Sequence, residues 1–128
     1  MGLGLVAFMT VGQLIAAIAA AVAIGIIVSH IIKLTVSFIS NKVREKLKQR
    51  RTQKVAVGDL DVIKNQCQNK TSVAELEKYV NEENATHVFA GVDENGHVVD
   101  IEMVGAETID SNANALINRT GEGMIVIS

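Results

Sequence analysis

Residues 12–32 read GQLIAAIAAAVAIGIIVSHII and contain no aspartate, glutamate, lysine or arginine. An uncharged apolar run of about 18 or more residues is typical of a transmembrane helix, because the hydrocarbon core is about 30 Å thick and a helix rises about 1.5 Å per residue. A buried helix of a globular domain would need a polar face, and a secretory signal peptide would need a basic region before a shorter apolar run. The sequence therefore predicts a transmembrane helix within residues 1–32, whose first residues lie at the membrane interface.

Charge divides the chain into three parts. Residues 1–32 carry none, residues 33–54 carry eight basic residues against Glu45, for a net charge of +7, and residues 55–128 carry four basic residues against thirteen acids, for a net charge of −9. Apolar, basic and acidic segments in that order indicate three environments. Because lysine and arginine concentrate on the cytoplasmic side of a span, we expect a single-pass protein with its N-terminus outside and residues 55–128 in the cytoplasm.

Small residues recur at four-residue spacing within the apolar run. In lipid, helices associate through close backbone approach across such ridges, so the pattern predicts a homo-oligomeric helix bundle. The predicted packing residues are Gly12, Ala16 and Ala20 on one ridge and Ala17, Ala21 and Gly25 on the other.

The basic segment, residues 33–54, continues as an amphipathic helix, because its apolar residues recur every three or four positions. Such a helix lies against anionic lipid or leaves the membrane as a bundle. Nucleic acid is the third partner that a basic cluster indicates, but the acidic segment that follows would repel it. The predicted apolar stripe is Ile32, Val36, Ile39, Val43 and Leu47, and the predicted lipid-headgroup contacts are Lys42, Arg44, Lys46, Lys48, Arg50 and Arg51.

Residues 55–128 read as a small α+β domain with an antiparallel sheet. The clearest local signal is a hairpin around Asn95-Gly96, because this dipeptide supplies the positive backbone angles of a tight turn. Ser72 followed by Glu75 forms a capping box that predicts a helix start. The expected elements are a short strand at 54–57, a helix from Leu60 capped by Asp59, a helix from Ser72 to about Asn84, strands at 87–92 and 97–104, a helix at 111–118 and a final strand at 124–127.

No catalytic or metal-binding pattern is recognisable in this domain. His87 and His97 flank the hairpin at positions where alternation predicts outward polar residues, and two histidines without further ligands do not make a metal site. One cysteine, Cys67, forms neither an internal disulfide nor a cysteine-based zinc site. We therefore expect no enzyme, no metal and no cofactor.

The layout resembles the short single-span effectors of bacterial antiviral systems, in which a cytosolic domain senses a cyclic nucleotide. The resemblance rests on layout and on no residue motif. It implies a small anionic ligand, for which Arg119, His87 and His97 are the candidate contacts.

Three functions follow as expectations. The first is a non-enzymatic oligomeric membrane effector or sensor, whose cytosolic domain binds a ligand or protein and couples it to the helix bundle, with pore formation left open. The second is a structural membrane scaffold or assembly subunit of a filament or virion, in which the basic segment of one subunit pairs with the acidic domain of the next. The third is a holin-like pore former.

Overall fold

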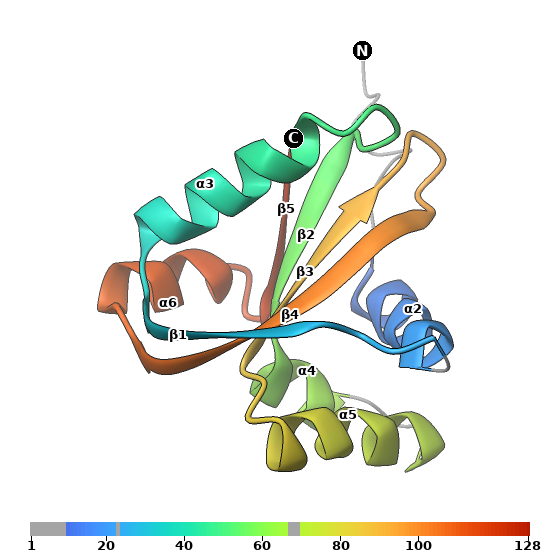
Figure 1. Cartoon of the computed structure of the whole chain (residues 1–128), viewed down its shortest axis with the longest axis vertical. Coiled ribbons are helices and arrows are strands. Elements are labelled where there is room, and N and C mark those ends of the chain that lie inside the picture. The colour runs from blue at the N-terminus through green and yellow to red at the C-terminus, as the bar shows by residue number, and fades with distance from the viewer. Residues whose placement is uncertain (1–9, 23, 67–69) are drawn as a thin grey trace.

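A five-stranded mixed sheet organises the computed structural model, which describes residues 10–22, 24–66 and 70–128 (Figure 1). The strand order is β1-β4-β3-β2-β5, in which β1 runs parallel to β4 and every other neighbouring pair is antiparallel. The elements are α2 (Val11–Val22), β1 (Val28–Leu34), α3 (Val36–Leu47), β2 (Lys54–Asp59), α4 (Leu60–Gln66), α5 (Lys70–Glu82), β3 (His87–Val92), β4 (Val98–Ile109), α6 (Ser111–Ile117) and β5 (Met124–Ile127).

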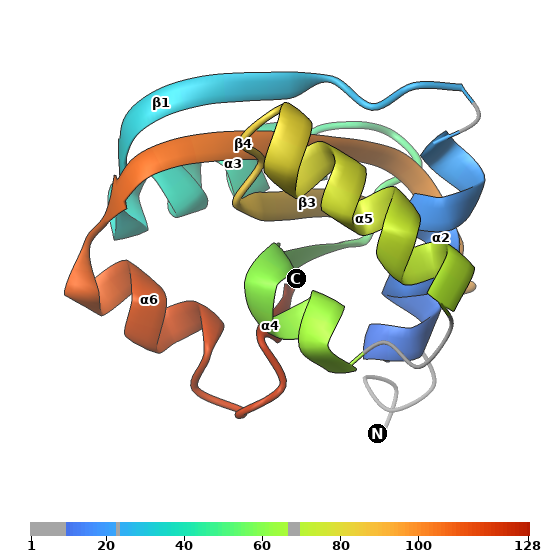
Figure 2. The same cartoon turned by 90° about the horizontal axis from the view of Figure 1, so that it is seen from below.

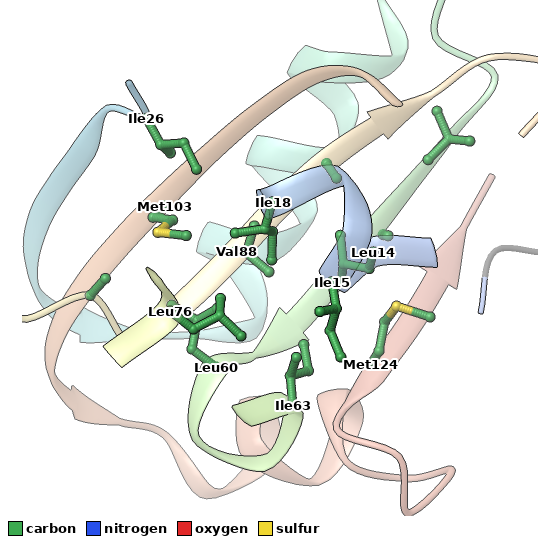
Figure 3. Close-up of a cluster of buried hydrophobic side chains, with 14 residues drawn as sticks. Leu14, Ile15, Ile18, Ile26, Leu60, Ile63, Leu76, Val88, Met103 and Met124 are labelled. Carbon is green, nitrogen blue, oxygen red and sulfur yellow. The ribbon is translucent and has the colours of Figure 1, made fainter. Parts of the chain in front are cut away.

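Helices cover both faces of this sheet (Figures 1 and 2). On one face, α2, α4 and α5 bury Leu14, Ile63 and Leu76 against strand residues, as Figure 3 shows. On the other face, α3 and α6 bury Ile39 and Ile117 together with other apolar side chains of the sheet. The central strand β3 is consequently buried along its whole length.

The predicted transmembrane helix is absent from this fold. Within the described residues, no helix combines the length and the hydropathy that crossing a bilayer requires. At about 1.5 Å per residue, the 12 residues of α2 rise about 18 Å, well short of a hydrocarbon core of about 30 Å. The predictions of a single-span membrane fold and of a single-pass membrane location are therefore wrong, and the orientation inferred from them falls as well.

The apolar run folds instead as a helix followed by a strand. Gly25 has a φ of +98°, and its N–H donates to the carbonyl of Ala21 at 3.0 Å, which closes the end of α2. Before Gly25 the run is rich in alanine, and after it β-branched residues dominate, which favour strands. Val28–Leu34 then pairs in parallel with β4. The backbone N–H and C=O groups that we expected to bond within a continuous helix therefore bond to a distant strand.

The basic segment also joins the sheet. The predicted amphipathic helix is present as α3, in which Ile39 and Val43 are buried, but Thr35 caps it through a 3.1 Å hydrogen bond from the Phe38 N–H. Ile32 therefore lies outside the helix, in β1, and is 75% exposed. The basic segment is not a continuation of a span, because a strand precedes it.

Local signals after residue 54 correspond closely to the observed elements. The hairpin is confirmed as β3 and β4, and Asp59 is confirmed as a cap because its Oδ1 accepts from the Asp61 N–H at 3.1 Å. One helix start differs, since α5 begins at Lys70 and Ser72 lies within the helix, whereas α6 begins at Ser111 as expected, with Asp110 at its N-cap. The sheet is mixed rather than antiparallel, because β1 joins it from the segment that we assigned to lipid.

Candidate functional site

A cavity of about 770 Å³ opens at the end of the sheet where β2 passes into α4 and α5 leads into β3. Cavities that bind small molecules typically measure about 300–1,000 Å³. The second half of β4 and the neighbouring part of β1 form another wall. The polar side chains that line the cavity include His30, Asp59, Asp61, Thr86, His87 and Glu107.

Strand pairing places two of these side chains next to each other. Asp59 ends β2, His87 begins β3, and the two residues are direct partners in the antiparallel register. Direct cross-strand partners have Cβ atoms about 4.5–5.5 Å apart on the same face of a sheet. The cavity therefore has a carboxylate and an imidazole side by side at one wall.

The hydrogen bonds around Thr86 indicate which ring nitrogen of His87 carries the proton. Thr86 Oγ1 donates to the Val104 carbonyl at 3.1 Å and accepts from the Ala106 N–H at 3.0 Å. Its third contact is His87 Nδ1 at 2.8 Å. With the single hydroxyl proton donated to Val104, we assign Nδ1 as the donor in this contact, which leaves the ring's free lone pair on Nε2.

Within residues 10–22, 24–66 and 70–128, His87 Nε2 has no hydrogen-bond partner, although the side chain is 0% exposed. Burial lowers the pKa of His87 below its usual value of 6.5, an effect that the charge of Asp59 opposes. The imidazole is therefore neutral at pH 7, and its Nε2 is an acceptor that no described protein group uses. Among the described residues, Thr52 Oγ1 is also buried without a partner, but Thr52 lies in the turn between α3 and β2 and does not line this cavity.

The carboxylate of Asp59 retains capacity for a further contact. Its Oδ1 caps α4 by accepting from the backbone of Asp61 at 3.1 Å, and its Oδ2 accepts a long 3.4 Å hydrogen bond from Asn118 Nδ2. Oδ2 is thus the less committed of the two oxygens, because an ionised carboxylate offers about four lone-pair directions.

Close backbone approach shapes the opposite wall. A Cβ atom on Gly105 would lie 2.5 Å from the Asn84 carbonyl oxygen and 2.8 Å from His30 Cδ2. His30 Nε2 in turn donates to the Glu83 carbonyl at 2.8 Å, which ties β1 to the end of α5. Glycine at position 105 therefore lets β4 pass close to the chain between α5 and β3.

The charged side chains of the cavity are acidic. Asp59, Asp61 and Glu107 line it, and no lysine or arginine among the described residues does. Lys64 does not line the cavity, but its Nζ lies 3.6 Å from the carboxylate of Asp61, which does. The cavity therefore favours positive over negative charge.

The arrangement suits binding better than reaction. The hydroxyl of Thr86 is engaged in three hydrogen bonds, so it is not available as a nucleophile. In the part of the chain that the structure describes, no group of three or more histidine, cysteine, aspartate or glutamate side chains is placed to hold a metal ion. What the cavity offers is an acceptor nitrogen, carboxylates and apolar wall residues.

The three predicted ligand contacts are not brought together. His87 lies in the cavity wall and is buried, so our expectation that it points outward is wrong, because β3 is central and covered on both faces. His97 is 79% exposed at the turn of the same hairpin, 3.8 Å from Asp93. Arg119 is exposed after α6 and does not line the cavity.

The predicted packing ridges lie on α2 and just beyond it. The helix buries Leu14, Ile15 and Ile18 against the sheet, and Ala21 of the second ridge packs against the same cluster. A groove of about 700 Å³ separates the alanines from the start of β4. Ala16, Ala17, Ala20 and Ala21 line this groove, Gly12 is exposed in the first turn, and Gly25 follows the helix.

The predicted lipid-headgroup residues divide into two groups. Lys46 is only 3% exposed and forms ion pairs with Asp100 and with Glu102, the latter at 2.8 Å. Lys42 approaches Glu102 at 3.4 Å and lies 5.8 Å from the ring centre of Phe38. The remaining four are exposed: Arg44, Lys48, Arg50 and Arg51.

The sequence analysis did not predict that Asp59 lies beside His87 in this site. The cap signal identified Asp59 as a local feature, and the hairpin signal identified the strand that contains His87. Their adjacency depends on the pairing of β2 with β3, which lies outside the hairpin.

Comparison with protein-family models, with curated proteins and with solved structures found no match to this chain.

Proposed function

We propose that this chain is a small-molecule-binding domain and that the cavity beside His87 holds the ligand. The observation that carries the proposal is that His87, which lines a cavity of ligand size, is fully buried and that its Nε2 has no hydrogen-bond partner among the described residues. A buried polar atom without a partner costs about 1–3 kcal/mol, and a ligand that donates a hydrogen bond to it recovers part of that cost.

The apolar rim supports the same proposal. Ile32 is 75% exposed and Ile109 is 38% exposed, and both line the cavity. Exposed large apolar side chains at the mouth of a cavity are typical of a binding site in which the bound ligand covers them. We therefore place the apolar part of the ligand against this rim and its polar part at His87.

The binding function retains the ligand-recognition part of our first expectation without its membrane part. Pore formation and coupling to a transmembrane bundle both require a span, and no described helix provides one. The charge complementarity invoked for an assembly subunit is met within one chain, where Lys42 and Lys46 of α3 contact Glu102 of β4. We therefore propose ligand binding rather than assembly.

A fragment screen monitored by backbone amide chemical shifts tests the proposal. Hits should shift amides around the cavity, and His87→Leu should remove these shifts. The matched variant His97→Leu, at the exposed turn of the same hairpin, should retain them. Hits that are unaffected by His87→Leu, or a screen without any hit near the cavity, would contradict the proposal.

A further inference from the structure

We infer that the ligand of this cavity is a small organic cation, a protonated amine on an apolar body, whose ammonium group contacts both His87 Nε2 and the carboxylate of Asp59. The inference rests on the proposed binding function and specifies the chemical class of its ligand. It reverses the sign of charge that the resemblance to nucleotide-sensing effectors implied.

The first argument is the direction of the hydrogen bond. In the tautomer assigned above, Nδ1 of His87 donates to Thr86 Oγ1 and Nε2 is a lone-pair acceptor. It therefore requires a donor from the ligand, and an ionised carboxylate or a phosphodiester group has none. Ammonium provides three N–H donors on one atom, so one can point to Nε2 and another to a neighbouring acceptor.

The second argument is that this neighbouring acceptor is a carboxylate. Asp59 is the direct cross-strand partner of His87, and among the described residues its Oδ2 accepts one hydrogen bond, the 3.4 Å contact from Asn118. A buried cation is costly unless it is paired with an opposite charge and hydrogen-bonded, and these two residues supply both requirements.

The third argument is the remaining charge of the wall. Asp61 and Glu107 add negative charge, and no basic residue among the described lining side chains opposes a cation. Asp61 is shared with Lys64 at 3.6 Å and is exposed, so it contributes less than Asp59. An anionic ligand would meet three carboxylates and no cation in this wall.

The inference is tested with three probes that share one apolar body and differ in the head group: 2-phenylethylamine, 2-phenylethanol and 3-phenylpropanoate. We expect the amine to bind the full chain at least about tenfold more tightly than the alcohol, because hydrogen bonds to charged groups are stronger. We expect the carboxylate not to bind. Titration followed by amide chemical shifts gives all three affinities under one condition.

Two variants assign the preference to residues. Asp59→Asn keeps a side chain that caps helices and should reduce amine affinity about tenfold while leaving the alcohol unchanged. Asp93→Asn is the matched control, because Asp93 also accepts backbone N–H groups in a turn but lies at the far end of the hairpin. If Asp59→Asn does not fold, the exposed Glu107→Gln should still lower the ratio of amine to alcohol affinity.

The outcomes separate this inference from the proposed function. Equal binding of amine and alcohol at the cavity, or tighter binding of the carboxylate, overturns the cation inference and leaves ligand binding in place. An amine preference that survives Asp59→Asn and Glu107→Gln also overturns it. Failure of all three probes overturns the cation inference, whereas the proposed function falls only with the fragment screen.

Discussion

The strand β4 borders two regions that each contain a buried polar side chain, and the two regions differ in whether the chain provides a partner for it. In its first half, Asp100 and Glu102 receive the buried ammonium of Lys46 from α3. In its second half, Gly105 and Ala106 border a cavity in which the buried imidazole of His87 keeps one unpartnered nitrogen. Where the chain supplies the partner, the polar cluster is structural, and where no described residue supplies one, we propose that a ligand does.

The pKa directions of the two buried groups express this difference. Burial opposes the charged form of Lys46, but hydrogen bonds and charge from Asp100 and Glu102 outweigh it and raise its pKa above the usual 10.5. At His87 burial prevails over the charge of Asp59 and lowers the pKa. One group is thus held charged and the other neutral at pH 7.

Removal of the Lys46 charge should have the largest effect on stability. Lys46→Met leaves two carboxylates facing each other under α3, and breaking a buried ion pair costs about 3–5 kcal/mol. Asp100 and Glu102 are 33% and 20% exposed, so water offsets part of this cost, and we expect a loss of about 2–3 kcal/mol. Urea denaturation measures it, with the exposed Arg44→Met as the control that changes little. A loss equal to that of the control would show that the cluster is not structural.

Closure of the cavity wall should have the next largest effect. Gly105→Ala places a methyl group 2.5 Å from the Asn84 carbonyl oxygen, and we expect a loss of about 2 kcal/mol from overpacking. Gly12→Ala is the opposite case, because the nearest atom to its added Cβ would be 3.8 Å away. Alanine also favours a helix more than glycine does, so this variant should raise the free energy of unfolding slightly. Thermal unfolding of both variants checks the sign, and a neutral Gly105→Ala would contradict the close approach at this wall.

Replacement of the unpartnered imidazole should stabilise the protein and remove ligand binding. His87→Leu eliminates a buried acceptor without a partner, while Thr86 Oγ1 keeps its bonds to Val104 and Ala106. We expect a gain of up to about 1 kcal/mol in the free energy of unfolding. If the variant is destabilised as strongly as Lys46→Met, the two regions are equally structural, and the distinction between them is lost.

The pH dependence should be the smallest effect and should differ in direction for the two groups. Because the pKa of His87 is lowered on folding, the unfolded chain binds more protons below pH 6.5, so stability falls as the pH drops through that value. Because the pKa of Lys46 is raised, its contribution is full below pH 10.5 and is lost as the pH rises beyond it.

The His87 contribution is isolated by comparing the wild type with His87→Leu between pH 5 and 7. Asp59, Asp61, Glu107, His30 and Lys64 surround or adjoin the same cavity, and their common effects cancel in the difference. The wild type should lose stability relative to the variant on acidification, as measured by denaturation midpoints. Parallel pH profiles would show that His87 is not kept neutral by the fold.

Much of the fold from α3 onward was predictable because its signals are local. The Asn95-Gly96 turn, the cap at Asp59 and the apolar spacing of Ile39 and Val43 in α3 each act within a few residues. The candidate site was less predictable, since it joins Asp59 and His87 through a strand pair that no turn connects. Alternation suggested an outward His87 because it does not reveal how many layers cover a strand.

By itself, the sequence determined where apolar, basic and acidic residues concentrate and which short segments begin and end as helices or turns. Only the tertiary structure decided what surrounds them. An apolar run such as residues 12–32 satisfies lipid and a protein interior equally well, because burial of apolar surface is non-directional. The pairing of Val28–Leu34 with β4, more than 60 residues later, resolved that choice in favour of the sheet. The same long-range pairing helps to form the cavity, because β1 and the end of β4 line it together with Asp59 and His87.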